Sequence, residues 1–248
     1  MTRILVIPDV HSRSFWKDSV DKYKDEVDKI IFLGDYVDPY PNENITRRES
    51  IQILEDVLEL AWNHQEKVVT LIGNHDAHYF LKNFPRSTRF DSSHAHHLRE
   101  IYLANAHLLK LAHEETVNDK KFLFTHAGLM RSWAERNRNV IGEPTVDSLN
   151  KLTQTQQGIK ALSDISRYRT WMGEPSGSIL WSDVREKIDN NSSEDNILAN
   201  EDSIHELYDF QIFGHTQLAK DPIITDKWAC LDCRKAFVIS EEGKLIEA

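Results

Sequence analysis

One pattern recurs along this chain of 248 residues: a short run of β-branched or aromatic residues leads closely to Asp, Asn or His. The clearest copy is Lys67–Asp76, in which the apolar run ends at Gly73 and Asn74, His75 and Asp76 follow. The run predicts a buried strand that stops at the glycine. Ligands of open α/β sheets bind at the carboxyl ends of the strands, so we expect chemistry at these polar residues.

Four further stretches have the same form. They are Arg3–Ile7 leading to Asp9 and His11, Lys29–Asp35, Lys121–Thr125 leading to His126, and Gln211–His215. Five such strand ends predict one site at one edge of a sheet. A helical pattern that follows a capping box at Thr46 and Glu49 and runs to about Asn63 predicts a β-α-β unit with parallel strands.

The rest of the chain is organised less regularly. We interpret residues 1–248 as a single domain with a polar, partly helical insertion at about 130–207, which we place near the site as a candidate lid. Within it, Asp189–Asp202 has the composition of a solvated acidic loop. Glu114–Phe124 predicts a hairpin, and Trp228–Leu245 predicts closing antiparallel strands.

Composition and charge exclude several classes of protein. A formal charge of −10 weighs against a broad nucleic-acid surface, which needs basic patches. No apolar run has the length of a membrane span, and no basic-then-apolar leader precedes the first strand, so we expect a cytoplasmic protein without a membrane partner. Cys230 and Cys233 form a C-x-x-C that fits a redox pair or half a zinc site; we favour two buried thiols.

The polar residues at the strand ends form a mixed set of oxygen and nitrogen donors. They are Asp9, His11, Asp35, Asn74, His126 and His215. Such donors suit Mn, Fe or Zn better than Ca or Mg, and we take Mn as the first choice. Six ligands exceed what one ion takes beside a reactive water, so we expect two divalent ions about 3.5–4 Å apart that share a nucleophilic hydroxide.

A general acid is also expected. His75 adjoins the ligand Asn74, and Asp38 follows Asp35 by three residues. A histidine held by a carboxylate is the usual construction of an oriented acid. We therefore expect His75 to protonate the leaving alkoxide and Asp38 to orient His75.

Together these motifs resemble the calcineurin-like metallophosphoesterase superfamily. The matching segments are D-V-H at Asp9–His11, G-D-Y-V-D at Gly34–Asp38, G-N-H-D at Gly73–Asp76, T-H-A-G-L at Thr125–Leu129 and G-H-T-Q at Gly214–Gln217. L-W-S-D at Leu180–Asp183 is similar to the serine/threonine protein phosphatase branch. The resemblance implies an α/β fold, a β-sandwich of mixed sheets flanked by helices in four α/β/β/α layers.

The resemblance also implies a role for each site residue. Asp9, His11 and Asp35 would bind the first metal ion, Asp35 would bridge to the second, and Asn74, His126 and His215 would complete that second site. His75 would be the general acid and Asp38 its partner.

Two positions depart from the family pattern. Gln217 stands where many members have a second histidine, and Pro39 stands where protein phosphatases have an arginine that binds phosphate. The candidate replacement cations are Arg13, Arg131, Arg167 and Arg169. We choose Arg13, two residues past His11, as the substrate-binding residue.

The leading functional hypothesis is a dinuclear metal-dependent phosphoesterase, specifically a protein-phosphatase-like phosphomonoesterase acting on a phosphorylated protein. The first alternative is a hydrolase of dinucleoside polyphosphates or cyclic nucleotides, because Trp133, Trp171 and Trp181 are candidates for stacking on a base. The second alternative is an inactive scaffold. The complete set of ligands and the paired acid argue against a scaffold, since a degenerate site is expected to have lost some of them.

Overall fold

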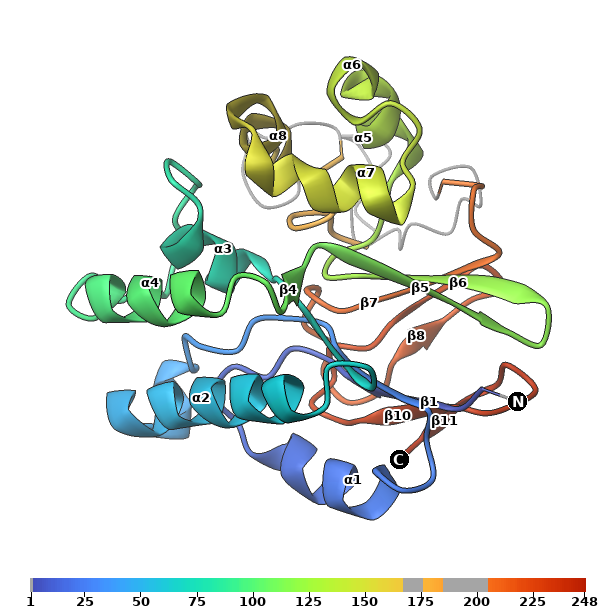
Figure 1. Ribbon diagram of the computed structural model, residues 1–248, viewed down its shortest axis with the longest axis horizontal. Coiled ribbons are helices and arrows are strands. Elements are labelled where there is room, and N and C mark those ends of the chain that lie inside the picture. The colour runs from blue at the N-terminus through green and yellow to red at the C-terminus, as the bar shows by residue number, and fades with distance from the viewer. Residues whose placement is uncertain (1, 167–175, 185–204) are drawn as a thin grey trace.

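Two mixed β-sheets stack face to face, and helices cover the outer face of each sheet (Figure 1). The computed structural model describes residues 2–166, 176–184 and 205–248. Helices α1 (Phe15–Tyr23) and α2 (Arg47–Asn63) lie on the first sheet, and a group of short helices lies beyond the second. The four-layer α/β/β/α fold predicted from the sequence is confirmed.

The first sheet has the strand order β11-β10-β1-β2-β3-β4. Its strands are β1 (Ile4–Ile7), β2 (Lys29–Phe32), β3 (Val68–Leu71), β4 (Leu109–Lys110), β10 (Phe237–Ile239) and β11 (Leu245–Glu247). Strands β1 to β4 are parallel, as the β-α-β pattern predicts, and β10 and β11 add an antiparallel edge.

The second sheet has the order β5-β6-β7-β9-β8. Its strands are β5 (Ala112–Val117), β6 (Lys120–Thr125), β7 (Phe210–Phe213), β8 (Ile223–Ile224) and β9 (Trp228–Cys230). The predicted hairpin is β5–β6. The predicted closing antiparallel strands are present in β10 and β11, whereas β9 pairs antiparallel with β8 but parallel with β7 before the chain turns and enters the other sheet.

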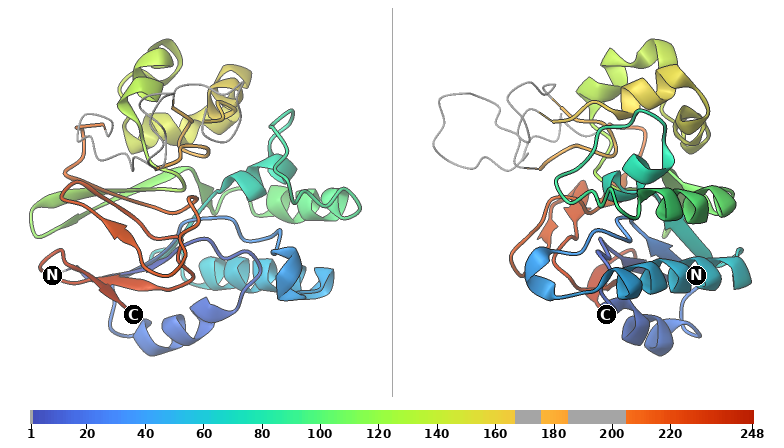
Figure 2. Two further views of the ribbon diagram at one scale, coloured as in Figure 1. Left: turned by 180° about the vertical axis from the view of Figure 1, so that it is seen from behind. Right: turned by 90° about the vertical axis from the view of Figure 1, so that its left-hand side faces the viewer.

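The remaining helices are short. They are α3 (Asn74–Phe80), α4 (Ala95–Ala104), α5 (Arg131–Arg136), α6 (Arg138–Ile141), α7 (Val146–Asn150) and α8 (Gln156–Leu162), with 3-10 turns η1 (Pro41–Glu43) and η2 (Lys151–Gln154). Helices α5 to α8 form the outer layer over the second sheet (Figure 2). No helix within the described ranges has the length and apolar character needed to cross a bilayer.

Helix α2 begins at the predicted capping box, in which the Thr46 side chain accepts from the backbone N–H of Glu49 and the Glu49 carboxylate accepts from Thr46. Helix α3 begins at Asn74, because the G-N-H-D motif itself forms the first turn. Its Asp76 carboxylate accepts the N–H of Gly73, 2.8 Å away. This turn fixes the first polar residues after β3.

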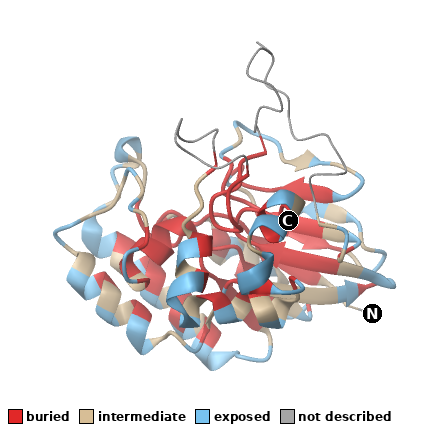
Figure 3. Ribbon diagram, turned by 90° about the horizontal axis from the view of Figure 1, so that it is seen from above, coloured by how far each residue is buried: buried red, intermediate tan, exposed pale blue. Residues whose placement is uncertain are grey.

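Three layers of apolar side chains hold the sandwich together. On β1, Leu5 and Ile7 pack toward the helices, whereas Ile4 and Val6 pack against the second sheet. This alternation follows from the two-residue period of a strand. Buried residues concentrate in the strands, and the outward faces of the helices are exposed (Figure 3).

The helical layer over the second sheet has its own apolar contacts. Trp133 is fully buried and Trp181 is 6% exposed, and both belong to the core cluster that includes Leu123 of β6. The polar composition of the predicted insertion therefore hides a buried face. The acidic segment Asp189–Asp202 and Trp171 lie outside the described residues.

Cys230 and Cys233 are both buried and free, as predicted. Cys230 ends β9, and Cys233 lies in the turn that leads to β10. The fold therefore uses the C-x-x-C as small buried side chains, with Cys230 on the helix-covered face of the second sheet and Cys233 in the core between the two sheets.

Candidate metal centre and active site

The carboxyl ends of β1, β2, β3, β6 and β7 carry all six predicted metal ligands. These ligands are Asp9, His11, Asp35, Asn74, His126 and His215, and each is at most 8% exposed. The first four follow strands of the first sheet, and the two last follow strands of the second. The site therefore lies where the two sheets meet.

One group of donor atoms converges around Asn74. The Asn74 Oδ1 atom lies 2.9 Å from Nδ1 of His215 and 3.0 Å from Nε2 of His126. Those two ring nitrogens are 3.1 Å apart, and His126 Nε2 is 3.6 Å from an oxygen of Asp35. Two imidazoles, an amide oxygen and a carboxylate thus face a single point.

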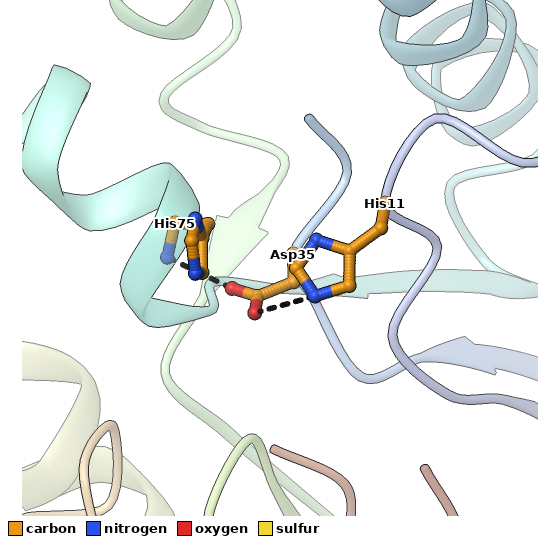
Figure 4. A group of neighbouring side chains, drawn as sticks. All are labelled: His11, Asp35 and His75. Carbon is orange, nitrogen blue, oxygen red and sulfur yellow. Dashed lines mark hydrogen bonds and ion pairs between the residues drawn. The ribbon is translucent and has the colours of Figure 1, made fainter. Parts of the chain in front are cut away.

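A second group lies on the other side of Asp35. Its Oδ2 atom is 3.4 Å from Nε2 of His11, and Asp35 lies between His11 and His75 (Figure 4). Asp9 is 4.0 Å from His126 and accepts the backbone N–H of His215 at 2.9 Å. Asp35 is therefore shared by both groups, which is the placement required of a bridging carboxylate.

Hydrogen bonds to backbone carbonyls orient two of the imidazoles. Nδ1 of His126 lies 2.9 Å from the carbonyl oxygen of Leu33, and Nδ1 of His11 lies 3.1 Å from that of Val37. Donation from Nδ1 leaves Nε2 of each ring as the acceptor that faces Asp35. Metal-binding histidines are usually held in this way.

The electrostatics of the cluster favour a cation. Burial, reinforced by the charge of Asp232, raises the pKa of Asp9 well above its usual value. Burial and the charges of Asp9 and Asp76 raise the pKa of Asp35 in the same direction. Burial lowers the pKa of His11, so its ring stays neutral and can act as a ligand. Divalent ions would neutralise the crowded carboxylates, so this donor set fits metal ions.

Two glycines make room for the carboxylates. A Cβ on Gly214 would lie 1.9 Å from Oδ2 of Asp9, and a Cβ on Gly73 would lie 2.1 Å from Oδ1 of Asp35. No side chain can occupy those positions without displacing a carboxylate. Glycine is therefore required in G-H-T-Q and G-N-H-D, because a carboxylate packs closely against the backbone at each of these positions.

The backbone is strained at several of the same positions. His11, Asp35, Asp38 and His215 have φ values of 43°, 54°, 59° and 64°, in the left-handed region that non-glycine residues rarely adopt. Such strain persists only where the surroundings enforce it, and it concentrates at functional sites. The strained residues lie where the donor atoms of the site converge.

His75 lies beside the metal cluster and is held by Asp38. His75 Nδ1 is 2.8 Å from Oδ2 of Asp38, and Tyr79 donates its hydroxyl to the other Asp38 oxygen at 2.6 Å. Burial opposes ionisation of Asp38, yet the hydrogen bonds from His75 and His78 hold its pKa below the usual value. Burial lowers the pKa of His75 to about 4.

Sequence reasoning missed Arg89, which extends into the site from the segment after α3. Its Nη2 atom lies 3.1 Å from Nε2 of His11 and 3.2 Å from Nε2 of His75, and its Nε donates to the backbone oxygen of Asp38 at 2.9 Å. Nothing in the local sequence R-S-T-R-F-D singles this arginine out. Arg131 instead pairs with Glu206.

Arg13, the predicted substrate-binding residue, lies next to the site, and its Nε donates to Glu43 at 2.8 Å. Its charge acts on the nearby Asp9 and His11. Arg167 and Arg169 lie outside the described residues.

Asp76, the last residue of the G-N-H-D motif, is a second residue whose contacts the sequence did not predict. Its Oδ2 accepts the N–H of Asp35 at 2.7 Å, and its Oδ1 accepts the N–H of Tyr36 at 2.9 Å and the hydroxyl of Tyr102 at 2.6 Å. Burial raises its pKa to about 6 despite these donors. Asp76 therefore ties the loop after β2 to the first turn of α3 and so positions Asp35 beside Asn74.

The sequence over residues 2–218 matches the model of the calcineurin-like phosphoesterases. The chain belongs to this family. This calcineurin-like phosphoesterase is a metal-dependent hydrolase of phosphate esters, and its buried His/Asp groups are suited to divalent ions. A comparison with curated proteins found no match.

Several solved structures are similar to this calcineurin-like phosphoesterase. A protein serine/threonine phosphatase from Saccharomyces cerevisiae is 14% identical, with a TM-score of 0.49 over 100% of this chain and 79% of the other. An archaeal phosphodiesterase is 11% identical, with a TM-score of 0.41 over 100% and 99% of the two chains. A hypothetical protein from Pyrococcus horikoshii is 10% identical, with a TM-score of 0.48 over 100% and 87%.

Proposed function

We propose that this protein is a dinuclear metal-dependent phosphomonoesterase of the protein-phosphatase-like type. The observation that supports it is the position of Asp35, whose carboxylate faces His11 at 3.4 Å on one side and His126 at 3.6 Å on the other. One shared carboxylate between two donor groups suits a pair of ions, and the histidine–carboxylate pair of His75 and Asp38 lies beside them.

Two divalent ions fit the cluster. Asp9, His11 and Asp35 would hold one, and Asp35, Asn74, His126 and His215 would hold the other. Mn is our first choice, with Fe or Zn as alternatives, because the donors mix nitrogen and oxygen. Such ions polarise phosphoryl oxygens and activate water at neutral pH.

His75 is the proposed general acid. Its Nδ1 faces Asp38, so Nε2 is the atom that carries the transferable proton toward the site. Without substrate, burial keeps the ring neutral, with a pKa of about 4. A bound phosphate dianion next to Nε2 favours the protonated ring, because an opposite charge stabilises it. His75 then donates the Nε2 proton to the leaving alkoxide.

Arg89 is the proposed ligand of the reacting phosphate. It supplies the guanidinium that protein phosphatases carry at the position of Pro39. Its Nη2 atom lies between the rings of His11 and His75. His11 is a proposed ligand of the first metal ion, and His75 is the proposed general acid. A planar guanidinium makes paired hydrogen bonds to two phosphate oxygens, so Arg89 would hold the phosphorus atom between the metals and His75.

We rank the phosphomonoesterase above the nucleotide hydrolase. The nucleotide alternative relied on tryptophans that would stack on a base, but Trp133 and Trp181 are committed to the apolar core. The partner we propose is a phosphorylated protein, and a cytoplasmic location is a prediction that cell fractionation tests.

The deciding experiment combines metal analysis with two chromogenic substrates. We expect two metal ions per chain after purification with Mn²⁺ present, and hydrolysis of p-nitrophenyl phosphate in preference to its bis ester. Preference for the diester would contradict the monoesterase and favour the nucleotide alternative. A chain with neither metal nor turnover would refute the proposed function altogether.

A further inference from the structure

Three arginines surround the ring of Tyr40, at the start of η1. Their guanidinium carbons lie 3.9 Å (Arg89), 5.1 Å (Arg13) and 5.8 Å (Arg234) from the ring centroid. The same ring contacts His11 edge-on, with the centroids 5.2 Å apart. Residues far apart in the sequence thus form one cationic group, the Tyr40 arginine cluster, directly beside the proposed first metal site.

One carboxylate, Glu43, forms salt bridges with two arginines of the Tyr40 arginine cluster. Glu43 is 2.8 Å from Nε of Arg13 and 3.6 Å from Nη2 of Arg234. Among the described residues, no carboxylate pairs with Arg89. The buried carboxylates of Asp9, Asp35 and Asp232 also act on Tyr40, so the cluster is distinguished by its unused donor atoms and not by its net charge.

Arg13 contributes two donor atoms without an acceptor. Its side chain is only 12% exposed, and Nη1 and Nη2 are buried with no hydrogen-bond partner in the described part of the chain. Buried donors left unpaired are costly, so retained ones call for an acceptor. Glu43 holds the Nε side of Arg13, which leaves the Nη atoms for that acceptor. Arg234, at 45% exposed, connects the cluster to the surface.

We propose that the Tyr40 arginine cluster is a second phosphate subsite. Arg13 and Arg234 would bind a second phosphoryl group of the phosphorylated substrate whose first phosphoryl group is held by Arg89 and hydrolysed. The substrate class is a phosphate ester with another phosphoryl group close to the scissile one. Guanidinium groups match phosphate oxygens in pairs, and two such groups around one ring suit two neighbouring phosphates. This inference rests on the proposed function and refines its substrate.

The test measures binding with probes that are not hydrolysed. The Mn²⁺-loaded protein is titrated calorimetrically with inorganic phosphate and with methylenediphosphonate, and both are assayed as competitive inhibitors of p-nitrophenyl phosphate hydrolysis. We expect the diphosphonate to bind at least about tenfold tighter than phosphate, the effect of one added charge-assisted contact of about 1.4 kcal/mol.

Variants assign the extra affinity to the cluster. Arg13→Gln is expected to bring the ratio of the two affinities close to one, and Arg234→Gln to lower it several-fold. Arg3→Gln is the matched control, because Arg3 pairs with Glu26 at the opposite ends of the strands, and its ratio should equal that of the wild type. Thermal unfolding checks each variant, and the exposed Arg234 provides the test should Arg13→Gln fail to fold.

Two outcomes would overturn the second subsite. Equal affinity of the wild type for both probes would do so. A diphosphonate preference that survives in both variants would also do so, since it would assign the extra affinity to the metal ions. Either result leaves metal binding and monoester turnover intact, so the subsite and the proposed function fail separately.

Discussion

Oδ2 of Asp38 lies 2.8 Å from Nδ1 of His75 and 2.9 Å from Nε2 of His78, so one carboxylate oxygen contacts two imidazoles. Tyr79 donates to the other oxygen. This arrangement leaves the ring of His75 little freedom to rotate, and it fixes which nitrogen faces the metal cluster. His75 is thus oriented as a proton donor is required to be.

Replacement of His75 tests the assignment of the acid. We expect His75→Asn to retain both metal ions and to lose roughly 10²–10⁴-fold in kcat with phenyl phosphate, the usual contribution of a general acid. The loss should be smaller with p-nitrophenyl phosphate, whose leaving group needs little protonation. Full activity with phenyl phosphate would rule out this role, and loss of metal would make His75 a ligand.

Replacement of Asp35 tests the bridge. Because its two oxygens face different donor groups, Asp35→Asn is expected to reduce the metal content below two ions per chain and to abolish turnover. Elemental analysis and p-nitrophenyl phosphate assays check this. A variant with two ions still bound at wild-type affinity would contradict the bridging assignment.

The glycine after β7 offers a geometric test. In Gly214→Ala the new Cβ would meet Oδ2 of Asp9 at 1.9 Å, so we expect displacement of that carboxylate and weaker binding at the first metal site. Gly142→Ala is the control, because its Cβ would meet nothing within 4 Å, although its φ of +69° costs some stability. Calorimetric Mn²⁺ titration distinguishes the two; equal affinities would show that the close approach is not required.

Substitution of Arg89 tests the phosphate ligand. Arg89→Gln is expected to lower kcat/KM about 10–100-fold, the value of a hydrogen bond from a charged group. Arg89→Lys keeps the charge but loses the planar fork, so its activity should lie between those of Arg89→Gln and the wild type. Steady-state kinetics with inorganic phosphate as inhibitor checks both, and wild-type phosphate affinity in Arg89→Gln would exclude the contact.

The buried thiol of Cys233 predicts how the stability of the fold depends on pH. Burial raises the pKa of Cys233 from 9.0 to about 11, so the folded state favours the neutral thiol. A raised pKa contributes stability below pH 9 that is lost as the pH rises toward 11. Urea unfolding from pH 8 to pH 10.5 should show this decline, and Cys233→Ser should lessen it. An equal decline in the variant would assign the effect to other groups.

The sequence predicted the parts of this protein whose signals are local. The capping box of α2 and the polar residues after each strand depend on neighbours within a few positions. The turn after β3 is likewise formed by the residues of the G-N-H-D motif themselves. The position of Arg89 in the site depends on how the segment after α3 folds back over His75. The spacing of residues along the sequence does not indicate this. The same holds for β9 and β10, because the turn after Cys230 transfers the chain between sheets and both strands have the same apolar pattern.

The division of the ligands between the two sheets has a mechanical consequence. Asp35 and Asn74 follow strands of the first sheet, whereas His126 and His215, assigned to the same ion, follow strands of the second. A bound ion would therefore act as a cross-link at the edge of the sandwich and oppose separation of its halves. Since ions bind the folded chain, their concentration would add to its resistance to heat by mass action. The centre that performs the chemistry would also hold its own scaffold closed.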